Sequence, residues 1–519
     1  MTHPRADLAG IVAWLQSRAA AAAGRRGDLQ LDSRRVDEGD VFVALPSVIA
    51  SGDDGRRYLQ AARSRGAVAA LVEAEGFDGA DAGLPVLPVA QLRPVLGELA
   101  AVYYGLPSES MQVVGVTGTN GKTSTAFWTA QMLSRAGRRC AVMGTVGSGF
   151  PGEPLADSAL TTPDAIALQR EVRRLRDAGA RALAMEVSSI GLEQGRVNGM
   201  CFDVAVFTNL TRDHLDYHGT MQAYEAAKAL LFEWPTLTAA VLNIDDAAGR
   251  RLAARLGGRS RAGALEVTGF TTAAGAVDPA AAEAVTRLLV ARDVRAGADG
   301  LEFTLQCGRI EHGMAVPLLG SFNVSNLLAT IGAALACGVD LAAACRIAPL
   351  LQPPPGRMQR VSSGSGDGPL VVVDYAHTAD AIEQALLALR PQASARDGKL
   401  WIVFGAGGDR DPGKRASMGA AASRHADRVV ITSDNPRREE PAAIAVAVAA
   451  GAPSWLDVEI ILDRAEAIEH AVGAADERDV VLIAGKGHEA TQDSGGVKRP
   501  FSDAERARAA LEARVGVTC

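Results

Sequence analysis

The sequence predicts an α/β protein of three domains, with mostly parallel sheets flanked by helices. Three observations lead to this prediction. The chain has 519 residues, and one domain takes roughly 100–200 residues. From Val113 onward, short apolar runs alternate with helical stretches, which is typical of parallel strands joined by crossover helices. The run Pro353-Pro354-Pro355-Gly356 indicates a stiff linker followed by a turn.

The first domain is expected over residues 1–109. It contains the short apolar runs Val41–Leu45 and Val68–Val72, separated by polar or glycine-containing stretches. The alanine run Ala19–Ala23 favours a helix. We expect an α/β domain that binds a nucleotide sugar here, for reasons of resemblance given below.

The second domain is expected over residues 110–353 and opens with the strand-like run Val113–Val116. The stretch Gly257–Glu283 is rich in Gly and Ala and carries no motif, so we interpret it as a variable excursion of this domain. The other predicted strands of the domain are Cys140–Met143, Ala182–Val187, Val204–Thr208 and Ala240–Asn243.

The third domain is expected over residues 354–519, as a Rossmann-like α/β unit with helices between its strands. Its predicted strands are Leu370–Asp374, Leu400–Gly405, Arg428–Thr432 and Val480–Ala484.

The composition excludes several classes of protein. Hydrophobic residues make up 48% and charged residues 22%, which excludes general disorder. The net charge of −7 gives no electrostatic footprint for nucleic acid, so anionic substrates would need local positive groups. The six cysteines include no CxxC pair, which argues against a disulfide framework or a cysteine-based zinc site.

No basic segment followed by an apolar run opens the sequence, so we expect no signal peptide. The most apolar runs, such as Leu400–Gly405, are far shorter than a membrane span. We therefore expect a cytoplasmic protein without a membrane span, and we expect it to be a monomer.

The strongest single signal for function is the glycine-rich stretch from Gly115 to Ser124, GVTGTNGKTS. It follows a predicted strand and leads into the helical pattern Thr125–Ala136. Glycines let backbone N–H groups turn toward a phosphate, and the helix N-terminus adds positive potential. Lys122 would reach the β- and γ-phosphates, and the Thr123 hydroxyl would bind Mg²⁺. The alternative is a strand–helix turn without a nucleotide, since Val116 breaks the strict GxxxxGK[ST] spacing.

Two further segments carry candidate metal ligands. Glu186 ends a predicted strand, where ligands of open α/β sheets collect, so it is a candidate Mg²⁺ ligand or else a solvated carboxylate. The stretch Asn209–Gly219 is dense in polar groups directly after another strand, although surface loops are also polar. On the following helical stretch, Met221–Phe232, Lys228 is the one charge on a stripe with Tyr224 and Phe232; from the spacing alone, a snorkelling surface lysine is the default interpretation.

Together these segments resemble the Mur ligases of peptidoglycan synthesis over nearly the whole chain. No single motif settles the resemblance, but the ordered set is highly specific. The matching segments are Asp32–Arg34, Gly39–Ala44, Thr117–Thr123, Thr161–Pro163, Glu186–Ser189, Asn209–Gly219, Gly320–Asn326, Gly356–Met358, Asp374–Thr378, Gly407–Asp411, Asp434–Arg437 and Gly485–Glu489.

The resemblance implies an ATP-dependent amide ligase that also uses Mg²⁺. It implies that Lys228 is carbamylated, which turns a cation into an anionic oxygen ligand and replaces the snorkelling interpretation. Lys122, Lys228, His214 and Arg357 are the implied catalytic residues. The implied metal ligands are Thr123, Glu186, His214 and Lys228. The implied ATP-binding residues are Gly118, Thr119, Asn120, Gly121, Lys122, Thr123, Ser124, Asn323, Arg357 and Asp374, and His377 is a further candidate.

The resemblance also implies the two other substrates. The acceptor is expected to be UDP-N-acetylmuramoyl-L-alanyl-D-glutamate, held by Ser33, Thr161, Thr162, Ser188, Gln194 and Arg196. In the family, the motif Asp434–Arg437 goes with meso-2,6-diaminopimelate, whose additional carboxylate suits an arginine fork. The implied residues for this amino acid are Arg410, Asp434, Asn435, Pro436, Arg437, Gly485 and Glu489. A plain turn is the alternative for the Asn-Pro pair.

The sequence departs from the family pattern at three positions: Ile190 stands in place of His, Gln359 in place of Glu, and Ala379 in place of Pro. None of these removes a group assigned to chemistry. Ser47 stands in a region where relatives often have Gly.

Three rival functions remain open. A related ligase could add lysine, a preformed dipeptide, or glutamate on folate; the Asp434–Arg437 motif and the N-terminal domain argue against these. A phosphate-loop ATPase could act as a switch, and would hydrolyse ATP without the other substrates. A catalytically dead scaffold is disfavoured because Lys122, Lys228, His214 and Arg437 are all present.

Overall fold

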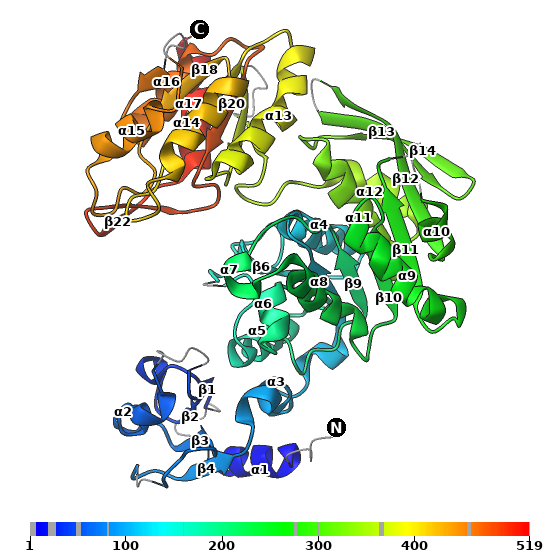
Figure 1. Cartoon of the computed structure of the whole chain (residues 1–519), viewed down its shortest axis with the longest axis vertical. Coiled ribbons are helices and arrows are strands. Elements are labelled where there is room, and N and C mark those ends of the chain that lie inside the picture. Colours follow the sequence, from blue (N-terminus) through cyan, green and yellow to red (C-terminus); the bar gives the residue numbers. More distant parts are fainter. Residues whose placement is uncertain are drawn as a thin grey trace. The chain divides into compact units, whose positions relative to one another are not determined.

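The computed structural model describes residues 7–18, 27–47, 53–79, 82–158, 160–273, 278–297, 300–362, 368–453 and 458–517. The alanine run Ala19–Ala23 lies outside the described residues. Contacts divide the chain into two compact units: Met1–Lys122 with Leu133–Ala240, and Thr123–Met132 with Val241–Cys519. The mixed α/β architecture expected from the sequence is confirmed (Figure 1).

The N-terminal part is a small parallel sheet covered on both faces. Its strands β1 (Leu29–Gln30), β2 (Val41–Ala44), β3 (Ala69–Glu73) and β4 (Val86–Val89) lie in sequence order. Because successive side chains of a strand point to opposite faces, Val41 and Val43 pack with α1 and α3, while Phe42 packs with α2. The helices are α1 (Leu8–Arg18), α2 (Leu59–Ser64) and α3 (Leu92–Tyr103).

A ten-stranded sheet carries the phosphate loop, with the order β14-β13-β12-β11-β10-β9-β5-β8-β6-β7. Strand β5 lies in its interior and pairs in parallel with β8 and β9. The predicted strands of this part are confirmed to within one residue at most ends. The bounds are β5 (Gln112–Thr117), β6 (Cys140–Gly144), β7 (Gly147–Gly149), β8 (Ala182–Glu186), β9 (Val204–Phe207), β10 (Ala239–Asn243) and β11 (Glu266–Thr271).

The far edge of this sheet was not predicted. Strands β12 (Arg287–Gly297), β13 (Gly300–Cys307) and β14 (Ile310–Val316) form an antiparallel meander, with a register shift between Arg292 and Arg295. The stretch Gly257–Glu283 is not simply an excursion, since it contributes β11, which pairs in parallel with β12. This strand is short and lies within a Gly- and Ala-rich stretch, and it contains Glu266 and Gly269, whose residue types are depleted in strands.

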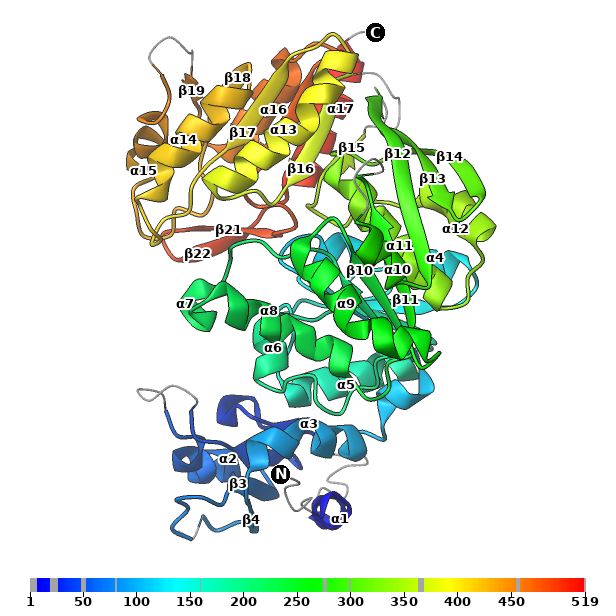
Figure 2. The same cartoon turned by 45° about the vertical axis from the view of Figure 1, so that its right-hand side comes forward.

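The helices of this central part flank the sheet (Figure 2). Their bounds are α4 (Lys122–Arg135), α5 (Ala165–Asp177), α6 (Ser189–Glu193), α7 (Leu215–His218), α8 (Met221–Ala229), α9 (Ala247–Arg261), α10 (Pro279–Glu283), α11 (Phe322–Ala336) and α12 (Leu341–Ile347).

Helix α4 is tied to the chain just before the proline-rich linker. Trp128 Nε1 and Gln131 Nε2 both donate to the carbonyl of Gln352, at 2.9 and 2.8 Å. The Gln352 N–H donates in return to Gln131 Oε1 at 3.0 Å. The helix that begins in the phosphate loop therefore holds the start of the linker by three hydrogen bonds.

The C-terminal part is a six-stranded sheet with the order β15-β16-β20-β17-β18-β19, parallel except for β15. Its predicted strands are confirmed. The bounds are β15 (Gln359–Val361), β16 (Leu370–Asp374), β17 (Leu400–Phe404), β18 (Arg428–Ile431), β19 (Val458–Ile460) and β20 (Val480–Ala484).

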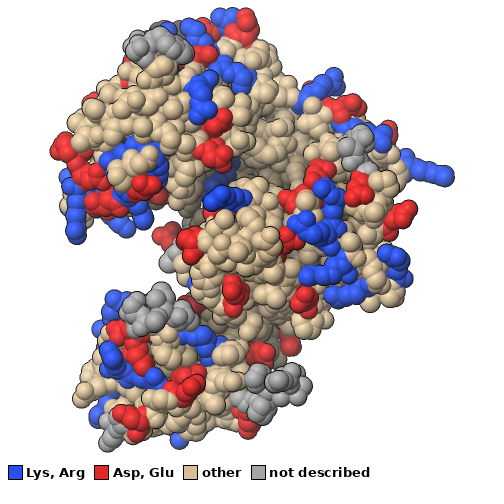
Figure 3. Space-filling view, in the orientation of Figure 1, with Lys and Arg blue, Asp and Glu red and all other residues tan. Residues whose placement is uncertain are grey.

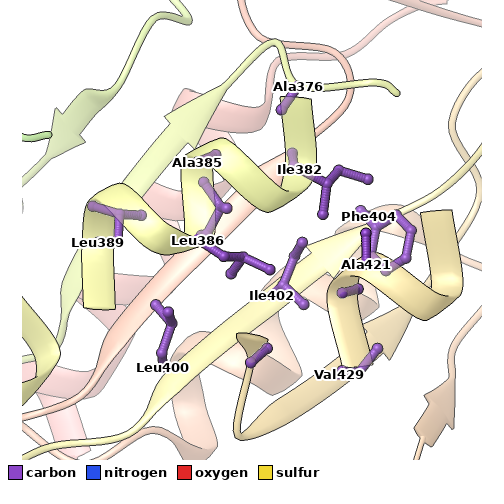
Figure 4. Packing of buried hydrophobic residues seen from close by; sticks show 14 of the residues in the cluster. Ala376, Ile382, Ala385, Leu386, Leu389, Leu400, Ile402, Phe404, Ala421 and Val429 are labelled. Carbon is purple, nitrogen blue, oxygen red and sulfur yellow. The ribbon is translucent and has the colours of Figure 1, made fainter. Parts of the chain in front are cut away.

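Helices cover both faces of this C-terminal sheet. On one face, Ile382, Leu386 and Leu389 of α13 pack on Ile402 and Phe404 (Figure 4). A two-stranded hairpin, β21 (Thr491–Ser494) with β22 (Val497–Pro500), was not predicted. The helices are α13 (Ala379–Ala395), α14 (Lys414–His425), α15 (Pro441–Ala449), α16 (Arg464–Ala474) and α17 (Asp503–Val517).

Candidate active site

The phosphate loop joins β5 to α4, which begins at Lys122. Gly118 has φ +147°, and a Cβ atom there would overlap the Thr208 hydroxyl, so the position requires glycine. The segment after β9 braces the loop: Asn209 accepts from the Asn120 N–H through Oδ1 and from the Thr119 N–H through its carbonyl, both at 2.9 Å. Two neighbouring strand ends therefore fix the loop.

The Lys122 side chain folds back onto this loop. Its Nζ donates to the carbonyls of Gly118 and Thr119, at 2.9 and 2.8 Å. Thr123 is buried in the first turn of α4 and Ser124 is half-buried beside it. Lys and Arg side chains are interspersed with Asp and Glu on the face seen in Figure 3, so positive potential for phosphate has to come from local groups such as Lys122 and the helix N-terminus.

Lys228 is a buried amine, with 2% of the residue exposed. Its Nζ donates to the Gly118 carbonyl at 2.8 Å and lies 4.3 Å from the centre of the Tyr224 ring. Burial, reinforced by the nearby charge of Lys122, lowers the pKa of Lys228 to about 6. The snorkelling interpretation from the spacing is therefore wrong: the amine points inward and is largely neutral at pH 7.

Glu186 ends β8 as a buried carboxylate. Its Oε1 accepts from the Thr145 N–H at 2.7 Å, and its Oε2 accepts from the Thr145 hydroxyl at 3.2 Å. The Thr145 hydroxyl lies 3.0 Å from that of Thr161. Glu186 is thus not a solvated strand end, and Thr145, which the sequence did not single out, links it to the predicted acceptor residues.

The predicted acceptor residues of the central part come together. Thr162 Oγ1 donates to the Glu186 carbonyl and accepts from the Ser188 N–H, at 3.1 and 3.0 Å. Arg196 donates to Gln194 Oε1 at 2.7 Å and to the Thr162 carbonyl at 3.0 Å. Burial lowers the pKa of Arg196. Ser33 belongs to the N-terminal part, where it begins a short 3₁₀ turn after β1 and is itself buried.

Two histidines lie beside Tyr224. His214 is half exposed, has φ +51°, and its ring centre is 6.1 Å from that of Tyr224. The His218 side chain is buried, with Nε2 2.9 Å from the Ser189 hydroxyl and Nδ1 3.1 Å from Glu193. Burial lowers the pKa of His218. Sequence reasoning did not single out His218, whose partners lie more than twenty residues away in the chain.

The residues expected to bind the nucleotide from the C-terminal part form a small cluster. The Arg357 guanidinium lies 4.8 Å from the centre of the Tyr375 ring, which also contacts the His377 ring. Asp374 accepts from the N–H groups of Met358 and Ala376, at 2.8 and 2.9 Å. Burial raises the pKa of Asp374, opposed by these hydrogen bonds and by Arg357.

The substituted Gln359 keeps a defined role in this cluster. Its Oε1 accepts from the Gly356 N–H at 2.8 Å, a contact that a glutamate carboxylate could also make. Gly356 has φ +65°, and a Cβ there would overlap the backbone at Gly487 and His488.

Asn323, in α11, is buried and donates to the Leu319 carbonyl at 2.7 Å.

The predicted amino-acid residues gather where β18 and β20 end. Arg437 and Arg410 both lie beside Gly407, and Arg437 Nη1 donates to the Gly408 carbonyl at 2.5 Å. Gly485, with φ +115°, packs next to the Asp434 carboxylate. Pro436 connects Asn435 to Arg437, which has φ +51° and pairs with the hairpin at Ser494. The motif is therefore more than a plain turn.

Two buried cations beneath this group were missed by sequence reasoning. Lys486 contacts both Asn435 and Glu489. Arg464 makes a bidentate ion pair with Asp503 and donates to the carbonyls of Ser433 and Ala484, the residues directly before the two motifs. The Gly-Lys-Gly-His-Glu motif contained a signal for Lys486; no motif contained one for Arg464.

The oxygen donors present fit a Mg²⁺ ion, which prefers hard oxygen ligands. The Thr123 hydroxyl, the buried Glu186 carboxylate and, once carbamylated, Lys228 would supply them; a free lysine amine would not. Among the described residues, no group of three or more His, Cys, Asp or Glu side chains is placed to hold a metal. Oxygen ligands from a carbamate and from substrate phosphates would therefore be needed.

Within the described part of the chain, no helix is both long and apolar enough to span a membrane.

Comparisons with known proteins agree with these observations. Three family models match: "Mur ligase family, catalytic domain" over residues 28–104, "Mur ligase middle domain" over residues 116–334, and "Mur ligase, glutamate ligase domain" over residues 356–487. The chain is 51% identical over 513 residues to a UDP-N-acetylmuramoyl-L-alanyl-D-glutamate–2,6-diaminopimelate ligase of Ralstonia nicotianae, covering 98% of this chain and 97% of the relative. The protein of that name from Pseudomonas aeruginosa is 48% identical, with 94% and 95% covered.

Solved structures show the same likeness. A structure of a UDP-N-acetylmuramoyl-L-alanyl-D-glutamate–2,6-diaminopimelate ligase has a TM-score of 0.68 at 36% identity, covering 95% of this chain and 97% of the other. The MurF ligase of Thermotoga maritima, solved with ADP, has a TM-score of 0.58 at 18% identity, covering 95% and 99%. The second likeness shows the shared fold.

Proposed function

The chain belongs to the Mur ligase family, and from that premise we propose that it joins meso-2,6-diaminopimelate to the D-glutamyl residue of UDP-N-acetylmuramoyl-L-alanyl-D-glutamate, with ATP as the energy source. The near full-length match to ligases of that name supports the substrates. The observation on which the chemistry depends is the pairing of a braced phosphate loop with the buried amine of Lys228 at Gly118.

The reaction proceeds in two steps. The acceptor carboxylate attacks the γ-phosphorus of ATP, a P–O bond to ADP breaks, and an acyl phosphate forms. The amine of diaminopimelate then attacks the acyl carbon, and the tetrahedral intermediate expels phosphate while the nitrogen loses its proton. Such catalysis depends on positioning and charge neutralisation more than on a strong base.

The chain's own residues supply this positioning. The N–H groups at the start of α4 and the Lys122 ammonium hold the phosphates of ATP, on a loop that Asn209 braces through the Thr119 and Asn120 N–H groups. Thr161, Ser188 and Arg196 hold the acceptor, as donors to its polar groups. The Arg357 cluster contacts the nucleotide from the C-terminal part, and Asn323 lies on the adenine side.

Thr123, Glu186, His214 and the Lys228 carbamate would hold Mg²⁺, which would supply charge neutralisation at the phosphate oxygens. Because the pKa of Lys228 is lowered to about 6, its amine is neutral at pH 7. The neutral amine is the form that adds to carbon dioxide: its nitrogen bonds the carbon, one proton leaves, and an anionic carbamate results.

The amino acid is proposed to bind between the ends of β18 and β20. The guanidinium groups of Arg437 and Arg410 would bind the far carboxylate of diaminopimelate. The carboxylates of Asp434 and Glu489 would bind its ammonium. Lysine lacks that carboxylate, so its use would leave the arginines without an anion.

The direct test combines purified protein, ATP, Mg²⁺ and the UDP-linked dipeptide with either meso-diaminopimelate or L-lysine. The expected result is a new amide, with stoichiometric phosphate release, only with diaminopimelate. Sustained phosphate release from ATP alone would instead indicate a switch ATPase, and amide formation with lysine would indicate a lysine-adding ligase.

The carbamate has its own test. Lys228→Ala is expected to lower kcat by at least 100-fold, with partial recovery on adding a short carboxylic acid, which replaces the missing oxygen ligands. Unchanged activity in Lys228→Ala would remove that residue from the mechanism.

A further inference from the structure

Lys486 lies beneath the proposed amino-acid site with a fully buried side chain. It is the second residue after β20, between Gly485 and Gly487. Its Nζ donates to Asn435 Oδ1 at 3.0 Å and to Glu489 Oε2 at 2.8 Å. It therefore touches two residues that are proposed to face the substrate, while its own side chain is out of reach of solvent.

The contacts of Asn435 fix which way its amide points. Its Oδ1 accepts from Lys486 Nζ and also from the Asp493 N–H, at 2.9 Å. An ammonium and a backbone N–H can only donate, so the atom that meets them must be the oxygen. The Asn435 nitrogen is left on the other side, where Nδ2 donates to Glu489 Oε2 at 2.8 Å.

Lys486, Asn435 and Glu489 thus form a closed triangle of three hydrogen bonds. Two polar atoms remain for a ligand. Asn435 Nδ2 carries a second N–H, and Glu489 Oε1 accepts no hydrogen bond from the described residues. The Glu489 side chain is 35% exposed, so its free oxygen is within reach of solvent.

The donor, Asn435 Nδ2, can bind the carboxylate of an amino-acid centre, and the neighbouring acceptor, Glu489 Oε1, can bind its ammonium. Resting on the proposed function, we propose that Lys486 is a positioning residue that, together with the Asp493 N–H, holds this polarity, and thereby the preference for the amino-acid centre at the far end of meso-diaminopimelate. It acts through Asn435 and Glu489 and does not contact the substrate. L-Lysine presents an ammonium there but no carboxylate, so it uses only half of the pattern.

The main test is Lys486→Met, which keeps the length and removes the charge and all three donors. Without the ammonium, Asn435 Oδ1 is held by the Asp493 N–H alone, and the Glu489 carboxylate keeps Asn435 but loses its cationic partner, so both side chains are held less firmly. The KM for meso-diaminopimelate is expected to rise at least 10-fold, while the KM values for ATP and the UDP-linked acceptor stay within twofold. The preference for meso-diaminopimelate over L-lysine, as a ratio of kcat/KM, is expected to fall at least 10-fold.

A matched control is Lys399→Met, the same chemical change at an exposed lysine. Lys399 directly precedes β17, whereas Lys486 follows the C-terminal end of β20 in the same sheet. It is expected to leave all three KM values and the preference unchanged. A second variant, Asn435→Asp, keeps an oxygen for Lys486 but removes the donor, and is expected to produce the same selective loss while Lys486 is still present.

Equal changes in all three KM values would assign Lys486 a purely structural role and overturn the proposal, as would an unchanged preference in Lys486→Met. If Lys486→Met does not fold, Asn435→Asp decides: normal binding of meso-diaminopimelate in that variant overturns the proposal. Failure of the wild-type protein to ligate meso-diaminopimelate is a different result, because it contradicts the proposed function.

Discussion

Lys228 shows how burial and a neighbouring charge change the protonation state of a side chain. The buried amine contacts the Gly118 carbonyl and the Tyr224 ring and is poorly solvated as an ammonium, and the neighbouring Lys122 makes the charged form still less favourable. The sequence supplied the stripe of Tyr224, Lys228 and Phe232 but not its direction. Only the packing of α8 shows that the stripe faces inward.

The lowered pKa of Lys228 predicts how stability changes with pH. Between about 6 and the ordinary value of 10.5 the unfolded chain binds a proton that the folded chain does not, so folding becomes more favourable as pH rises. In buffer free of carbon dioxide, the free energy of unfolding of the wild type, relative to Lys228→Met, is expected to increase by up to about 2–3 kcal/mol from pH 7 to 9. Urea titrations at both pH values measure this; an equal change in both proteins would contradict it.

Replacing Arg437 by lysine tests whether the planar shape of the guanidinium, rather than its charge, matters for the binding of meso-diaminopimelate. Arg437→Lys keeps the cation but loses the planar fork that pairs with a carboxylate through two hydrogen bonds. The kcat/KM for meso-diaminopimelate is expected to fall by about 10- to 100-fold, or about 1.4–2.7 kcal/mol. Steady-state kinetics with each substrate varied measures this, and a comparable fall with ATP as the varied substrate would argue against a role at the amino acid.

At the scale of elements, apolar runs were good predictors wherever a strand is buried on both faces. Leu370–Asp374 and Val480–Ala484 were predicted at both ends, because parallel central strands are continuous hydrophobic runs. The meander β12–β14 was missed because it is half exposed and carries charges such as Arg292 and Asp293. The hairpin β21–β22 was missed for the same reason.

The candidate site was predictable where one motif supplies the chemistry, and not where distant segments meet. The phosphate loop is local in sequence, so its residues could be named in advance. The contact of Lys486 with Asn435 spans 51 residues, and that of Arg464 with Asp503 spans 39. No spacing rule reports such pairs, because strand order brings them together.

The ion pair of Arg464 with Asp503 predicts a strong effect on stability. Both side chains are fully buried, and Arg464 begins α16 while Asp503 begins α17, so the pair joins two helices to the ends of β18 and β20. Asp503→Asn leaves a buried guanidinium without its counter-ion and is expected to cost about 3–5 kcal/mol.

Urea unfolding of Asp503→Asn measures that cost. The double variant Arg464→Met with Asp503→Leu is the matched control, since replacing the whole pair by apolar side chains is expected to restore most of the lost stability. If the double variant is as unstable as Asp503→Asn, the lost stability does not arise from an uncompensated charge.

At the scale of the whole molecule, the substrates are assigned to different parts of the chain. Nucleotide, acceptor and amino acid can react only if those parts approach one another, so we expect closure on binding. Small-angle scattering is expected to give a smaller radius of gyration with an ATP analogue and the acceptor together than for the protein alone. Identical dimensions would contradict closure.

The three hydrogen bonds at Gln352 bear on where a hinge for closure can lie in the chain. Trp128 and Gln131 belong to α4, which begins in the glycine-rich loop after β5, and both hydrogen-bond to Gln352, just before the triple proline. Because these hydrogen bonds hold Gln352 to α4, a change in backbone direction is expected only after that residue. If closure occurs, we expect Gln352 to stay with α4 and the hinge to lie after it, so that Arg357, five residues further on, would move with the C-terminal part.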